Sequence, residues 1–168
     1  LWSESDRNAI GIYTVTVNET NKKDEQWYIN TDITYSFANN KVTGSYGTAT
    51  AKAHADTLWT QADSDNGLLP SNKSVGDVKT KGLKTILIET LKKQAAQILQ
   101  ETDWYIIRKA DAGTAVPSSI TTHRAAVRTK AAQMETSITN ASDTAALETL
   151  YTYTEQEDGS VTRPLGEL

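Results

Sequence analysis

The N-terminal third of the chain alternates between apolar and polar side chains with a period of two. In residues 27–37 the odd positions, from Trp27 through Ile33 to Phe37, are mostly large and apolar, and the even positions are mostly polar. This alternation is typical of a β-strand with one buried face. Residues 11–17 are rich in β-branched and aromatic side chains and predict a further strand.

A tight turn follows the alternating segment at Asn39-Asn40. Asparagine tolerates the positive φ that both central positions of a type I′ hairpin turn require. Phe37 and Val42 would then face each other across the turn. The sequence therefore predicts a β-hairpin over about residues 27–48.

The segments on either side of this hairpin are less regular. Residues 1–9 predict a short helix that carries Trp2 inward. Residues 48–62 fit two patterns, because their alanines alternate like a strand while some of them also fall at helical spacing with Leu58. We favour an extended strand that ends near Trp59.

A polar loop is predicted over residues 62–76. Asp63, Asp65 and Gly67 invite comparison with a calcium-binding loop, which places glycine at position 6 and glutamate at position 12. Here the glycine falls one position early, and Ser74 occupies the place of the glutamate. We therefore interpret the segment as a solvated turn.

In the second half of the chain the apolar spacing changes to three and four residues, which predicts amphipathic helices. A helix is predicted over about residues 77–100, with Ser74 and Asp77 as a capping box before it. A second helix is predicted after Pro117. The first apolar stripe is Leu83, Ile86, Leu87, Leu91, Ala95, Ile98 and Leu99. The second is Ile120, Val127, Ala131, Met134, Ile138 and Ala141.

Two such helices joined by a corner predict an antiparallel helical hairpin in which each buries its stripe on the other. Ser142 is predicted to cap a last short helix through Tyr151. The expected fold class is therefore α+β, with an N-terminal antiparallel hairpin or small sheet before a C-terminal helical hairpin with short extra helices. The expected regions are a β-rich part (1–70), a helical hairpin module (71–153) and an extended C-terminal arm (154–168).

Composition narrows the class of protein. Hydrophobic residues make up 38% of the chain, whereas about 45–50% is usual. This suits either a protein whose remaining apolar surface is covered by partners or a domain with long polar edges. The net charge of −4 and the absence of a basic block argue against a nucleic-acid partner.

Cysteine is absent, which excludes disulfides, thiolate metal sites and a cysteine nucleophile. Apolar runs are far shorter than the roughly 20 residues that span a bilayer, so no membrane partner is expected. No signal-peptide pattern is present. Because the printed chain begins at Leu1 and not at Met, we expect a processed chain or a fragment.

Catalytic chemistry has little support in the sequence. His54 and His123 are the only histidines, and neither has neighbours at metal-ligand or triad spacing. No phosphate-binding glycine loop, zinc-protease motif or nucleophile elbow is present. We therefore predict a non-enzymatic protein with no cofactor, no metal and no small-molecule substrate.

The second predicted helix carries a small basic face at Arg124, Arg128 and Lys130. Solvent exposure is the ordinary interpretation of such a face. Pairing with an acidic helix face or with the tail is the alternative.

The segment ETDWYIIRKA, residues 101–110, lies between the two predicted helices. Asp103 is placed to N-cap a short helix over residues 104–112, which has basic residues near its end and Gly113 as a stop. Four bulky residues in a row also fit a central strand, but the cap, the charge order and the glycine favour the helix. Trp104 and Ile107 would then pack back into the hairpin as a wedge.

Residues 95–138 resemble the C-terminal module of tailed-bacteriophage tail proteins described as tail assembly or tail-fibre assembly chaperones. In that family a helix runs into a TDW motif, a proline-containing linker follows, and the next helix starts with a YRxAVR-like sequence. The resemblance covers about residues 74–145, although His123 replaces the usual tyrosine and YIIRKADAG replaces a polar segment after TDW. The matching positions are Ile98, Leu99, Thr102, Asp103, Trp104, Pro117 and residues 123–128.

The resemblance implies a non-enzymatic structural component of a phage tail, at the baseplate or at the attachment of a tail fibre. Its partners would be other tail or fibre proteins, with copies of itself as a further candidate. It would be assembled in the host cytoplasm and retained in the virion. One alternative is a transient assembly chaperone that is absent from the virion. Another is a wall-degrading tail hydrolase, which would need a pocket with paired carboxylates.

The family is not known to have catalytic residues, so the residues singled out here form a structural signature. They are expected to shape the corner between the two long helices. The signature is Thr102, Asp103, Trp104, Ile107, Gly113, Pro117, Arg124, Val127 and Arg128.

Overall fold

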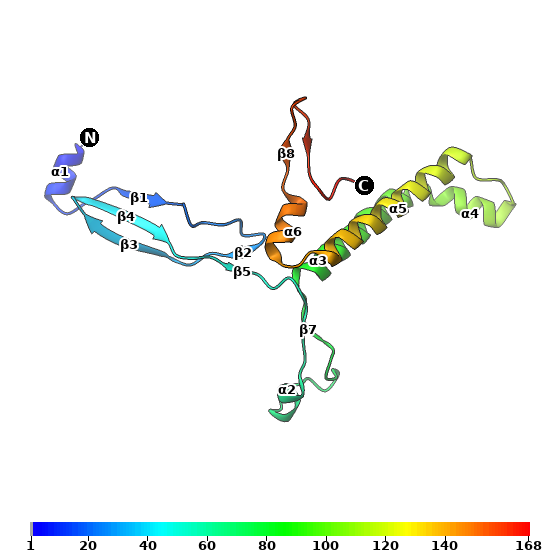
Figure 1. Cartoon of the computed structure of the whole chain (residues 1–168), viewed down its shortest axis with the longest axis horizontal. Helices are drawn as coiled ribbons and strands as arrows, with labels where there is room; N and C mark the ends of the chain where they lie inside the picture. The colour runs from blue at the N-terminus through cyan, green and yellow to red at the C-terminus, as the bar shows by residue number, and fades with distance from the viewer. Residues whose placement is uncertain (1) are drawn as a thin grey trace. The chain divides into compact units, whose positions relative to one another are not determined.

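The computed structural model describes residues 2–168, and the chain divides into two compact units, residues 1–52 and 53–168 (Figure 1). Small sheets lie near the N-terminus and helices dominate the C-terminal half, which confirms the predicted α+β class. Residues 53–70, which we expected to belong to the β-rich region, are part of the second unit.

The first unit begins with the short helix α1 (Glu4–Ala9), as predicted. The side chain of Ser3 accepts a hydrogen bond from the Asp6 amide, and the Asp6 carboxylate accepts one from the Ser3 amide, forming a capping box. Trp2 does not point inward as expected, since most of its side chain is exposed. A helix this short has no apolar stripe to bury, and none of its residues is buried.

A three-stranded sheet forms the main part of the first unit, with strand order β1-β4-β3. Its strands are β1 (Val15–Asn18), β3 (Ile33–Ala38) and β4 (Lys41–Tyr46). Strands β3 and β4 are antiparallel, and β1 runs parallel to β4. Asn39 and Asn40 have φ of 52° and 55°, and Phe37 lies opposite Val42, so the predicted hairpin and its register are confirmed.

The predicted strand over residues 27–37 is interrupted. Strand β2 (Tyr28–Ile29) pairs with β5 (Thr50–Ala51) in a separate two-stranded ladder. Between β2 and β3, the Asn30 side chain donates to the Lys23 carbonyl at 2.8 Å and accepts from the Lys23 amide at 2.9 Å. The Thr31 hydroxyl accepts from the Gly47 amide at 2.7 Å. At residues 30 and 31 these side-chain hydrogen bonds take the place of backbone pairing between strands. The period-two pattern had predicted one continuous strand there.

The second unit begins with a small hairpin formed by β6 (Thr57–Leu58) and β7 (Val78–Thr80). Residues 48–62 do not form the single extended strand that we favoured. They contain β5 and β6, two short strands of different sheets with a bend at residues 54–55 between them, and the segment ends in α2 (Gln61–Asp65). Helix α2 occupies the start of the segment that we expected to be a loop. The Thr60 and Asp63 side chains cap its first turn.

The first long helix, α3 (Leu83–Gln100), starts six residues later than predicted. Residues before it form β7, so Ser74 and Asp77 close a turn and do not cap the helix. The amides of Leu83 and Lys84 donate to the carbonyls of Ala53 and His54 at 2.9 and 3.0 Å. The helix therefore begins where a segment distant in sequence satisfies its first amides.

The second long helix, α5 (Ser118–Asn140), begins directly after Pro117, as predicted. The Lys84 ammonium donates to the Thr139 carbonyl at 2.8 Å, and the Lys92 ammonium lies 2.8 Å from the Glu135 carboxylate. The start of α3 therefore lies beside the end of α5, which confirms the antiparallel hairpin (Figure 1). Its buried apolar residues are Leu83, Leu91, Ala95, Val127, Met134 and Ile138.

The end of the chain packs on the same unit. Helix α6 (Thr144–Tyr151) is capped by Asp143 and not by Ser142. Strands β8 (Thr154–Glu155) and β9 (Val161–Thr162) then form a hairpin where we expected an extended arm. Leu165 is buried, and its amide donates to the Leu150 carbonyl at 3.0 Å. Across residues 2–168 no helix is both long enough and apolar enough to cross a membrane.

Candidate interaction site

Three residues of the predicted signature meet at the corner between the long helices. Arg124, with 7% of its surface exposed, donates through Nη1 to the Leu99 carbonyl at 2.6 Å and to Thr102 Oγ1 at 2.7 Å. Its Nη2 lies 2.8 Å from Asp103 Oδ1. The last carbonyls of a helix lack backbone partners, and a cation there is favourable. Arg124 on α5 therefore closes the C-terminal end of α3 and holds the start of α4 (Asp103–Ala112).

This network corrects the interpretation of the basic face. Arg124 is buried and not solvent-exposed, and its partners are the end of α3 and the single carboxylate of Asp103, not an acidic helix face or the tail. Arg128, one turn further along α5, is exposed, and Lys130 is half-buried. The sequence could not separate these three residues because only Arg124 lies opposite the end of α3.

The short helix at the corner is α4 (Asp103–Ala112). Asp103 lies in its first turn instead of at the N-cap, which is Thr102 and makes no side-chain capping bond. Gly113 ends the helix as predicted, with φ of 68° and its amide bonded to the Lys109 carbonyl at 3.0 Å. The helix is therefore confirmed and the role assigned to Asp103 is wrong.

Trp104 and Ile107 do not form the predicted wedge. They are 50% and 67% exposed, and α4 buries none of its side chains. The Trp104 ring lies 3.8 Å from the Tyr105 ring, and the Arg108 guanidinium lies 4.9 Å from its centroid. The polar network of Thr102, Asp103 and Arg124 holds the corner instead, and the apolar side chains of α4 remain uncovered.

The sheet of the first unit has a larger uncovered surface. Neighbours across the ladder place its large apolar side chains on one side, and we call this side the apolar sheet face. It consists of Val15, Val17, Ile33, Tyr35, Phe37, Val42 and Tyr46. Tyr35 and Phe37 are 64% and 57% exposed. Within residues 2–52, Trp27 is the only buried hydrophobic residue, so the unit has almost no core of its own.

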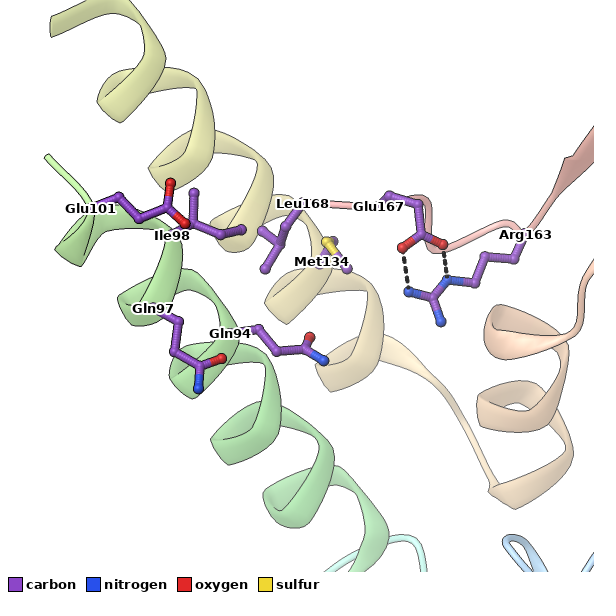
Figure 2. Close-up of a pocket in the computed structure, with 8 residues that line it drawn as sticks. All are labelled: Gln94, Gln97, Ile98, Glu101, Met134, Arg163, Glu167 and Leu168. Carbon is purple, nitrogen blue, oxygen red and sulfur yellow. Dashed lines mark hydrogen bonds and ion pairs between the residues drawn. The ribbon is translucent and has the colours of Figure 1, made fainter. Parts of the chain in front are cut away.

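A groove on the second unit lies between α3, α5 and the C-terminal segment (Figure 2). Two side chains hold the Glu167 carboxylate in this groove: Arg163 contacts it through Nε at 3.1 Å and Nη2 at 3.2 Å, and the Tyr153 hydroxyl donates to it at 2.7 Å. This hydrogen bond raises the pKa of Tyr153. A carboxylate held by a cation and a phenol is poorly placed for acid–base catalysis.

The remaining candidate residues have local structural roles. The His54 carbonyl accepts a bond from α3, and His123 is exposed on α5. Asp63, considered for a calcium loop, lies 2.7 Å from the Lys79 ammonium and caps α2. Residues 2–168 contain no cluster of three or more His, Cys, Asp or Glu side chains placed to hold a metal ion.

Comparison with protein-family models, with curated proteins and with solved structures found no match to this chain. The resemblance of the corner to phage tail proteins therefore stays a prediction. What the geometry adds is that Thr102, Asp103 and Arg124, chosen from the sequence, contact one another.

Proposed function

We propose that this protein is a non-enzymatic structural component of a bacteriophage tail, at the baseplate or at the attachment of a tail fibre. The observation that carries the proposal is the apolar surface that the chain leaves uncovered, on the sheet of one unit and on α4 of the other. Large exposed apolar patches mark sites of protein contact. A component with permanent neighbours in an assembly has such surfaces covered.

The accessible surface supports the same conclusion. The chain exposes 11,666 Å², whereas a compact monomer of 18.4 kDa exposes about 8,200 Å². Two separate compact domains with the sizes of the two units would together expose about 9,700 Å². The excess is surface that a free-standing domain would normally bury.

The helical hairpin suits a bracing element in such an assembly. Its core is continuous along α3 and α5, and the Arg124 network fixes the corner from which α4 extends. The resemblance of residues 74–145 to tail proteins supplies the phage context. Other tail or fibre proteins and copies of this chain are the proposed partners, and the virion tail is the proposed location.

Mass spectrometry of purified virions and of infected cells tests the proposal. We expect the chain in purified virions at a fixed ratio to the other tail proteins. Its presence in infected cells together with its absence from virions would contradict the proposal and would support a transient assembly chaperone.

The non-enzymatic part of the proposal has its own test. The isolated chain is incubated with peptidoglycan and with host surface glycans, and soluble fragments are measured. We expect no release above that of a heat-denatured sample. Cleavage would contradict the proposal and would support a wall-degrading tail hydrolase.

A further inference from the structure

We propose that the apolar sheet face is the contact surface between two copies of this chain, packed sheet against sheet. A three-stranded sheet needs a second layer over its hydrophobic face to be stable. Among residues 2–52 no element provides that layer, because α1 buries none of its residues and Trp27 is the only buried hydrophobic side chain. The proposal does not depend on the phage-tail assignment.

The register divides the sheet into two different faces. On β3 and β4, Ile33 and Tyr35 extend over Gly44, where an added Cβ atom would come within 2.8 Å of Ile33 Cγ2. The Tyr13 ring lies 4.6 Å from that of Phe37. The opposite face is formed by small polar residues, among them Thr34, Ser36, Thr43 and Ser45. Burial therefore stabilises only the apolar face, because the polar face would lose hydration.

The charge pattern favours a second copy as the occupant. Lys41 is the only charged residue in β1, β3 and β4, and by alternation it lies on the polar face with Thr43. Outside these strands, the Lys22 ammonium lies 5.7 Å from the centroid of the Tyr46 ring, at the end of β4. The centre of the apolar sheet face, around Tyr35 and Phe37, can therefore meet a copy of itself without like-charge repulsion. A charged partner surface would lose hydration there and gain no ion pair. A two-fold contact requires a self-complementary patch of this kind.

The area is sufficient for a specific dimer. Aromatic side chains bury about 150–250 Å² each when covered. Tyr35 and Phe37 are more than half exposed, and Val15 and Val17 add exposed area beside them. Each copy therefore contributes about 400 Å² from these four side chains. The half-buried Ile33, Val42 and Tyr46 on the same face add the area that brings two copies to the roughly 1,000 Å² at which specific interfaces begin. Sheets packed in this way keep their strands within about 30° of each other.

Sedimentation equilibrium of the full chain and two charge variants tests the proposal. Tyr35→Glu places a carboxylate on the apolar sheet face, and Thr34→Glu places the same group on the adjacent residue of the polar face. We expect the unmodified chain and Thr34→Glu to have twice the 18.4 kDa chain mass, and Tyr35→Glu to have the mass of one chain. Measurement up to about 100 µM detects dimers of micromolar affinity.

A photo-crosslinker keeps the test independent of any effect of Tyr35→Glu on folding. Benzoylphenylalanine at position 35 is expected to give a covalent dimer on illumination, and at position 34 it is expected to give none. A monomeric unmodified chain would overturn the proposal. So would a dimer that both charge variants leave intact, that both abolish, or that crosslinks equally from both positions.

Discussion

The helical hairpin and the N-terminal sheet are both amphipathic, but only the hairpin buries its apolar side within its own unit. Val127, Met134 and Ile138 of α5 lie against α3 and are buried, because two helices with facing stripes form two layers. The sheet has an equally regular apolar side, yet Tyr35 and Phe37 remain exposed. A hydrophobic pattern therefore specifies which face of an element is buried in the stable state. Whether that face is buried within its own unit depends on a second element that packs against it.

The largest expected effect on stability distinguishes the core of the helical hairpin from the apolar sheet face. Ile138→Ala removes a side chain that is 0% exposed, and such truncations cost about 2–5 kcal/mol. Urea unfolding followed by circular dichroism at 222 nm should show the helical transition at lower urea. Phe37→Ala, on the exposed sheet face, should leave that transition unchanged. Equal shifts from both variants would mean that the sheet and the hairpin share one core.

The next effect tests the corner of the hairpin. Arg124→Ala removes two hydrogen bonds and an ion pair from a buried guanidinium. Hydrogen bonds to charged groups contribute about 1.5–3 kcal/mol each to stability. Removing Arg124 also removes the cost of burying its charge, so we expect a net loss of about 2–3 kcal/mol in urea unfolding.

Arg128→Ala is the matched control, because Arg128 is exposed one turn away on the same helix. It should change stability by less than about 0.5 kcal/mol. Similar losses of stability in the two variants would mean that Arg124 stabilises α5 as any arginine on its surface would, and not through its bonds to Leu99, Thr102 and Asp103.

A smaller loss is expected at the junction before α3. A Cβ atom on Gly82 would collide with the backbone carbonyl of Ala55, and the Gly82 amide donates to Asp56 at 2.7 Å. Gly82→Ala should therefore destabilise the second unit by about 1–3 kcal/mol, as overpacking does. Lys81→Ala, one residue earlier in an exposed ion pair, should cost less than about 1 kcal/mol. A neutral Gly82→Ala would show that residues 53–56 do not hold the start of α3.

Trp104 on α4 resembles the sheet more than the hairpin core. Its side chain is half exposed and contacts Tyr105 and Arg108 of its own helix. Trp104→Ala should therefore cost less than about 1 kcal/mol in urea unfolding, whereas a buried aromatic would cost about 3–5 kcal/mol. A loss of about 3–5 kcal/mol would mean that Trp104 is buried against the helical hairpin, as the sequence predicted.

The predictions that succeeded depend on local patterns. Asn39-Asn40 specifies its own turn, and the turn sets the pairing of Phe37 with Val42. The stripes of α3 and α5 are likewise periodic within one element. Such features can be predicted because residues close together in the sequence determine them.

The predictions that failed depend on contacts between distant residues. The start of α3 is set by carbonyls of residues 53 and 54, and the burial of Arg124 is set by the end of α3. Trp104 was assigned to the core because it is large and apolar, but the polar network occupies the corner. Of the candidate site, the sequence identified the residues that meet there and did not identify how they meet.

The smallest expected effect on stability concerns the β6–β7 hairpin and α2. Polar contacts to Asp63 connect these elements. The Lys79 ammonium and the Thr60 amide and hydroxyl, all bonded to the Asp63 carboxylate, lower its pKa to about 2 from 3.8. Because the folded pKa is depressed, the stabilisation is complete above pH 3.8 and is lost as the pH falls toward 2. An NMR titration should show the Thr60 and Lys79 signals moving over this range while signals from the α3–α5 core stay fixed. Asp63→Asn should abolish the movement, whereas a titration midpoint near 3.8 would show that Lys79 and Thr60 do not hold the carboxylate in solution.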